Sequence, residues 1–109
     1  MINGKAAAYI DSAAQSELES IIARHGETYA SAHEGYAVLK EEIEETCEEI
    51  DAVKENLDKL WEGIRENFLP SALRKSVGII QEKAYYAAEE AVQVIAVCSR
   101  FSKTLEKEQ

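Results

Sequence analysis

The sequence has few residues that interrupt helices. Of its 109 residues, one is proline and five are glycine. Proline lacks an amide hydrogen, and glycine loses the most backbone freedom on folding, so both are unfavourable inside helices. The strict alternation of apolar and polar residues that marks half-buried strands is also missing. What dominates instead is Ala, Glu, Leu and Lys, and this composition predicts an all-α protein.

Cysteine is scarce as well. The two cysteines, Cys47 and Cys98, lack CxxC spacing and fall on or beside apolar helix faces. This pattern favours buried, reduced thiols over a disulfide or a zinc site.

Basic residues and long apolar runs are also in short supply. Lys and Arg number 12 against 21 Asp and Glu, which gives a formal charge of −9. Such a charge repels nucleic acid and anionic membranes. No segment approaches the roughly 20 apolar residues needed to cross a bilayer, and the start of the chain is too weakly apolar for a secretory signal. We therefore expect a cytoplasmic protein with neither a nucleic-acid nor a membrane partner.

The length predicts one domain, because cores of fewer than about 50 residues rarely fold alone. We expect this domain to span residues 1–109, with residues 1–10 frayed and the core at about 31–105. A short first helix is predicted from about Asp11 to His25, ending where Gly26 can adopt a positive φ. Ser31 and Glu34 have the spacing of a capping box, which predicts that a second helix begins there. Its periodicity continues to Phe68.

The single proline separates the second helix from a third. Pro70 disfavours helical backbone in the residue before it, and Ser71 is a suitable N-cap. The third helix is therefore predicted from Ala72 to about Leu105.

Each long helix carries apolar residues at alternating spacings of three and four, which is the pattern of a coiled-coil seam. The predicted inward residues are Tyr36, Leu39, Ile43, Thr46, Ile50, Val53, Leu57, Leu60 and Ile64 in one helix, and Leu73, Val77, Ile80, Ala84, Ala87, Ala91, Val94, Cys98, Phe101 and Leu105 in the other. Two antiparallel helices of about 50 Å cannot be covered by one short helix. We expect a homodimer or homotetramer that completes a four-helix-type bundle.

Carboxylates cluster on one flank of each long helix. Glu42, Glu45 and Glu49 share a flank of the second helix, since residues three and four apart lie on one face. On the third helix, Glu90 and Gln93 lie in a band beside the apolar seam. Oxygen ligands from two helices are suited to Mg²⁺, with Mn²⁺ as a second candidate. This pattern points to phosphate-ester or anhydride chemistry.

Residues 36–45 and 89–93 resemble the MazG-like all-α nucleoside triphosphate pyrophosphohydrolases. The resemblance covers about residues 31–105, and residues 33–38 and 91–101 look most like small phage- or prophage-associated members. It implies an Mg²⁺-dependent hydrolysis of a (d)NTP to the (d)NMP and pyrophosphate. Glu42 and Glu45 would then be catalytic residues, and the metal ligands would be Glu42, Glu45, Glu90 and Gln93, with Glu49 as a secondary ligand.

The chain departs from this family at Gln93, which stands where the family has aspartate. An amide oxygen can coordinate Mg²⁺ but supplies no negative charge. The alternative is therefore a non-catalytic helical scaffold or interaction protein with a degenerate metal site. As candidates for substrate binding we name Lys83, for a phosphate, and Tyr86, for stacking on a base.

Overall fold

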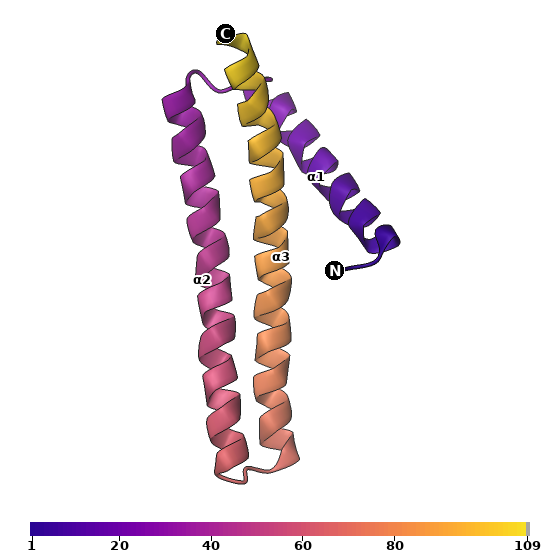
Figure 1. The fold of residues 1–109 in the computed structure, drawn as a ribbon, viewed down its shortest axis with the longest axis vertical. Helices are drawn as coiled ribbons and strands as arrows, with labels where there is room; N and C mark the ends of the chain where they lie inside the picture. Colours follow the sequence, from indigo (N-terminus) through magenta and orange to yellow (C-terminus); the bar gives the residue numbers. More distant parts are fainter. Residues whose placement is uncertain (109) are drawn as a thin grey trace. The chain divides into compact units, whose positions relative to one another are not determined.

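The computed structural model describes residues 1–108, which form three helices joined by short loops (Figure 1). Helix α1 spans Gly4–His25, α2 spans Ala32–Arg65 and α3 spans Pro70–Lys107. The described residues contain no strand. The predicted all-α class is confirmed, as is the order of one shorter helix followed by two long ones. None of the helices in residues 1–108 combines the length and the apolar character needed to cross a bilayer.

Helix α1 begins at Gly4 and not at Asp11, so the expectation that residues 1–10 are frayed is wrong for residues 4–10. Asn3 is the N-cap, and its side-chain oxygen accepts a hydrogen bond from the Ala6 amide at 2.9 Å. Asparagine is among the best N-cap residues, and the alanines that follow it favour a helix. The sequence interpretation overlooked this cap.

The junction between α1 and α2 follows the predicted signals. Gly26 has a φ of 90°, which an L side chain rarely adopts, and its amide donates to the Ile22 carbonyl at 2.8 Å. Glycine is therefore required at the end of α1. The Ser31 hydroxyl accepts a hydrogen bond from the Glu34 amide at 3.2 Å, which confirms Ser31 as the N-cap of α2.

Helix α2 ends at Arg65, three residues before the predicted end at Phe68. The amides of Asn67 and Phe68 donate to the carbonyls of Ile64 and Gly63, at 3.2 and 2.9 Å, and Asn67 has a φ of 56°. These two bonds form a Schellman motif, in which asparagine replaces the usual glycine in the left-handed position. The apolar pattern alone did not reveal this ending.

Helix α3 begins at Pro70, so the prediction that Ser71 caps a helix starting at Ala72 is wrong. The amides of Ala72 and Leu73 both donate to the Leu69 carbonyl, at 2.9 and 3.1 Å. Proline suits the first helical position because the amide hydrogen that it lacks has no partner within the helix there.

The chain divides into two compact units that share the long helices. The first unit contains Met1–Ile43 and the residues from Glu90 onward, and the second contains Glu44–Glu89. The second unit is a helical hairpin of α2 and α3 residues, and the first combines α1 with the remaining residues of the two long helices. Whether the chain acts as a single domain stays a prediction.

The core of the first unit joins α1 to the C-terminal part of α3. Ala14 and Leu18 of α1 are buried, as are Ala96 and Val97 of α3. Tyr29, in the loop after α1, is also buried and packs its ring edge-on against Phe101, with 6.3 Å between ring centres. Aromatic pairs prefer this arrangement.

The inward faces of the long helices differ from the predicted seams at every second position, except at Ala91, which is half-buried like Glu90. In α2, the large apolar residues of five predicted seam positions are exposed: Tyr36, Ile43, Ile50, Leu57 and Ile64. The residues one position earlier are less exposed: Gly35, Glu42, Glu49, Asn56 and Gly63. In α3, Ser76, Lys83, Glu90, Val97 and Thr104 are likewise more covered than Val77, Ala84, Cys98 and Leu105 are. Cys47 and Cys98 are free but exposed, so the expected burial of the thiols is wrong.

Glycine explains part of this difference. A Cβ atom at Gly35 would lie 2.8 Å from two carbons of the Phe101 ring and 2.9 Å from a third. At Gly63 it would meet Leu73 at 3.0 Å and Phe68 at 3.1 Å. Neighbouring side chains therefore pack closely against the backbone of α2 at both positions. This close packing favours the face that carries the glycines, and not the face of large apolar residues, as the inward face of α2.

We predict opposite effects for two glycine-to-alanine substitutions in the long helices. Gly35→Ala should lower the free energy of unfolding by about 1–3 kcal/mol, because the new methyl group overlaps the Phe101 ring. Gly78→Ala is the matched control, since nothing lies within 4 Å of a Cβ there. It should raise the free energy of unfolding by about 0.5–1 kcal/mol, the usual gain of alanine over glycine in a helix. Urea denaturation measures both, and stabilisation by Gly35→Ala would contradict the contact.

Candidate metal centre

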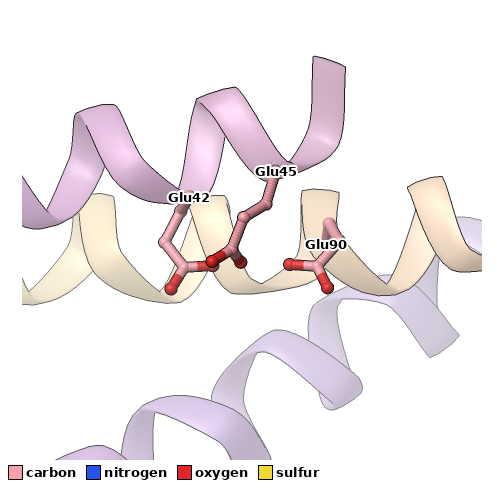
Figure 2. A group of neighbouring side chains, drawn as sticks. All are labelled: Glu42, Glu45 and Glu90. Carbon is pink, nitrogen blue, oxygen red and sulfur yellow. The ribbon is translucent and has the colours of Figure 1, made fainter. Parts of the chain in front are cut away.

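Three carboxylates converge from two helices (Figure 2). Glu42 and Glu90 both belong to the first unit, and Glu45 lies one turn beyond Glu42 on α2. Each offers one carboxylate oxygen, and these three oxygens lie within 4.8 Å of one another. All three residues are half-buried. The structure thus brings together the three glutamates that the sequence singled out first.

The spacing of these oxygens fits a hard divalent cation. Two oxygens bound to one Mg²⁺ are at most about 4.2 Å apart, because each lies about 2.1 Å from the ion. Small side-chain rotations would close the remaining gap. Like charges this close repel one another, and a bound cation would offset that repulsion. The donor set, made only of carboxylates, therefore suits Mg²⁺ or Mn²⁺ and not a softer metal.

Glu49, the predicted secondary ligand, is not part of this group. Its Oε2 atom is buried, accepts no hydrogen bond and lies 3.9 Å from the Lys83 Nζ atom. Lys83 and Glu49 both belong to the second unit and are partly exposed, at 36% and 28%. Glu49 thus forms an ion pair with Lys83, and its role as a secondary metal ligand stays a prediction.

Tyr86, the predicted base contact, also lies in the second unit. Its hydroxyl donates to the Glu82 carboxylate at 3.2 Å, and its ring meets Tyr85 edge-on. The Lys83 Nζ atom stands 5.7 Å from the ring centre. The hydrogen bond to Glu82 and the negative charge of that carboxylate raise the pKa of Tyr86, so the phenol keeps its proton. Substrate contacts by Lys83 and Tyr86 stay predictions.

A hollow of about 650 Å³ lies within the first unit. Its lining comes from the end of α1, the loop that follows, the start of α2 and the C-terminal half of α3. Glu42, from the carboxylate group, is one lining residue, and Gln93 is another. Glu34 and Val38 precede Glu42 by two turns and one turn, so the hollow follows one face of α2. Lys83 and Tyr86 do not line it.

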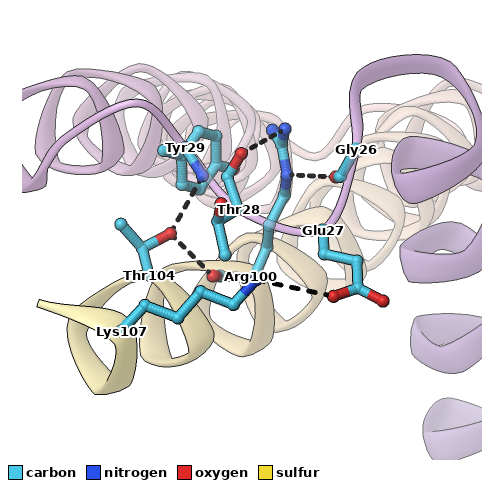
Figure 3. A network of polar contacts seen from close by, with 7 residues as sticks. All are labelled: Gly26, Glu27, Thr28, Tyr29, Arg100, Thr104 and Lys107. Atoms are coloured by element: carbon cyan, nitrogen blue, oxygen red, sulfur yellow. Dashed lines mark hydrogen bonds and ion pairs between the residues drawn. The ribbon is translucent and has the colours of Figure 1, made fainter.

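A buried arginine holds one wall of this hollow in place (Figure 3). Arg100 is only 5% exposed. Its Nε donates to the Gly26 carbonyl at 3.1 Å, and one Nη donates to the carbonyls of His25 and Thr28 at 3.0 and 3.1 Å. The guanidinium also lies over the Tyr29 ring, 4.1 Å from its centre. Arg100 therefore satisfies carbonyls at the end of α1, where the helix itself offers no donor.

Thr104 continues the same network one turn further along α3. Its hydroxyl accepts from the Tyr29 amide at 2.9 Å and donates to the Arg100 carbonyl at 3.1 Å. Arg100, Thr104 and Tyr29 form what we term the loop anchor. Sequence reasoning left the role of Arg100 open and missed Thr104, because the partners lie more than 70 residues away.

No protein family, curated protein or solved structure matches this chain. The resemblance to MazG-like enzymes thus rests on the residues quoted above and stays a prediction.

We predict that Arg100→Leu lowers the free energy of unfolding by roughly 2–3 kcal/mol, because three carbonyls lose a charged donor. Lys103→Leu, on the exposed side of the same helix, is the control and should change it by no more than about 0.5 kcal/mol. Urea denaturation compares the two variants. Equal small effects would show that the loop anchor does not stabilise the fold.

Proposed function

We propose that this protein is a Mg²⁺-dependent nucleoside triphosphate pyrophosphohydrolase that converts a (d)NTP to the (d)NMP and pyrophosphate. The observation that carries the proposal is the convergence of Glu42, Glu45 and Glu90, from two helices, within 4.8 Å. The hollow that shares Glu42 gives the organic part of a substrate room beside the carboxylates. The resemblance in residues 36–45 and 89–93 supports the same reaction.

The carboxylates would have two tasks in this reaction. Glu42, Glu45 and Glu90 would hold the cation, which would supply positive charge against the phosphates. Glu42 or Glu45 would accept the proton that the attacking water loses. The water oxygen bonds to the α-phosphorus as the bond to the bridging oxygen breaks, and pyrophosphate leaves. No nucleophilic side chain is needed, because the nucleophile is water.

We further infer that the chain self-associates through the exposed apolar residues of its long helices. On α2 these residues recur at every seventh position, Tyr36, Ile43, Ile50, Leu57 and Ile64, and each is more than 40% exposed. A heptad repeat of large apolar residues is typical of a face that packs against another helix. A homodimer that completes a four-helix bundle would bury this face, and a homotetramer of two dimers would do so as well.

The same exposed face supports the second candidate, a helical scaffold that binds another protein. The neutral Gln93 in place of a carboxylate favours it too. In a scaffold, the three glutamates would have no catalytic partner, and nucleotides would have no effect on the fold. Response to Mg²⁺ and a nucleotide therefore separates the two functions.

For the hydrolase, we predict that Mg²⁺ with a non-hydrolysable triphosphate analogue raises the melting temperature, since ligands that bind only the folded state stabilise it. Glu90→Gln removes one charge from the carboxylate group and should weaken Mg²⁺ binding at least about tenfold. Glu89→Gln is the control, because Glu89 is the exposed neighbour outside the group. Calorimetry and pyrophosphate release measure the effects. A chain that releases no pyrophosphate from any common nucleotide, and shows no Mg²⁺ response, would be the scaffold.

For self-association, we predict that Leu57→Glu shifts the protein toward the monomer, because it puts a charge into the apolar face. Lys59→Glu changes the charge of the same helix at an exposed residue outside the repeat and should leave the assembly unchanged. Sedimentation velocity measures the mass of each. A monomeric wild-type protein at about 100 µM would refute the dimer, since stable interfaces bind more tightly than that.

A further inference from the structure

Gln93 contributes to the wall of the hollow in the first unit, together with Val97 and Arg100 of α3. It follows Glu90 by one turn, so the face of α3 that carries the metal carboxylate continues into the hollow. On α2, Glu42 belongs to both the carboxylate group and the lining of the hollow. A molecule whose phosphates lie at the carboxylates therefore has its remaining part directed into the hollow.

The hollow has both apolar and polar lining residues. Its volume of about 650 Å³ falls within the usual range for small-molecule sites. Ile21, Val38 and Val97 are apolar, and Thr28 and Gln93 add neutral hydrogen-bonding groups. Charged or titratable residues complete the polar part: Arg24, His25, Glu34, Glu42 and Arg100. Apolar walls with a few polar groups suit a site that fixes the orientation of a ligand.

Arg100 also lines the hollow, but most of its donors are directed at the protein backbone. Its Nε and one Nη donate to three backbone carbonyls, and its face lies over the Tyr29 ring. Gln93 is the uncharged polar residue that α3 contributes to the lining. An amide presents a donor and an acceptor side by side, which matches the hydrogen-bonding edge of a nucleobase.

We propose that the hollow binds the nucleoside part of the substrate and that Gln93 is a specificity-determining residue that hydrogen-bonds the base, instead of a ligand of the metal. This inference rests on the proposed function for the direction in which the phosphates lie. It assigns the carboxylates to the phosphate end of the substrate and the neutral amide to the base. Gln93 is half-buried, and covering its amide without a matching partner is costly, so it discriminates between bases.

Two variants test this assignment. Ala30→Trp fills the hollow from an exposed loop residue of its lining, and Gln93→Leu removes the amide while keeping a similar volume. Binding of the common nucleoside monophosphates to the wild-type chain and both variants is measured calorimetrically in the presence of Mg²⁺, with inorganic pyrophosphate as the ligand that has no base. Mg²⁺ binding to each protein is measured separately, and circular dichroism checks that each is folded.

The wild-type chain should bind at least one monophosphate in the presence of Mg²⁺, and both variants should bind it at least about tenfold more weakly. Gln93→Leu should also reduce the differences in affinity among bases. Binding of Mg²⁺ and of pyrophosphate should be unchanged in both variants. The assignment is overturned if no monophosphate binds the wild-type chain, or if Gln93→Leu weakens Mg²⁺ binding and leaves base preference intact.

These outcomes are distinct from failure of the proposed hydrolase. Monophosphate binding that depends on Gln93, without pyrophosphate release from any triphosphate, would retain the nucleoside site and reject the reaction. The opposite result is that all three proteins, wild type, Ala30→Trp and Gln93→Leu, release pyrophosphate in Mg²⁺ with the same KM and the same base preference. This result would retain the reaction and reject the nucleoside site.

Discussion

The close packing of the long helices is the constraint on which the rest of the structure depends. In the first unit, a Cβ atom at Gly35 would displace the Phe101 ring, and in the second unit one at Gly63 would be crowded by Leu73 and Phe68. Packing through these glycines turns their face of α2 inward. The residues at intervals of seven from Gly35 lie on this face, and they include Glu42 and Glu49. Glu42 and Glu49 are therefore partly buried. In the predicted apolar seam, Ile43 and Ile50 would have been the buried residues instead.

The half-buried carboxylates of the two units have different neighbours. In the second unit, Lys83 lies beside Glu49, and the pair remains partly exposed, where ion pairs are weak and cost little to desolvate. In the first unit, Glu42 and Glu90 approach each other. A divalent cation bound there would offset the charge of the carboxylates.

The loop anchor positions one wall of the hollow, which is the second part of the candidate site beside the carboxylates. Arg100, Thr104 and Tyr29 hold the segment after α1 against α3 through buried hydrogen bonds. Because α1 ends in a glycine with positive φ, the chain turns sharply there and its last carbonyls face the guanidinium. The hollow is bounded on one side by this segment and on another by α2, so its shape depends on the anchor as much as on the carboxylates.

Local signals predicted much of the fold. Helix class, the junction at Gly26 and the Ser31 cap follow from interactions within a few residues, and these were correct. The start of α1 at Asn3 and the Schellman ending at Asn67 are equally local, but their signals were overlooked or masked by the apolar periodicity. The prominence of Glu42, Glu45 and Glu90 was also evident from their spacing along the helices.

Sequence alone therefore determined that the chain is helical, where its main breaks lie and which glutamates can share a helix face, because backbone propensity and 3.6-residue periodicity are properties of neighbouring residues. Only the tertiary structure decided which face of each long helix turns inward, because that choice depends on the fit of Gly35 against Phe101 and of Gly63 against Leu73. It also decided that Glu49 pairs with Lys83 and that Arg100 anchors the loop, since partners distant in sequence meet only when helices pack.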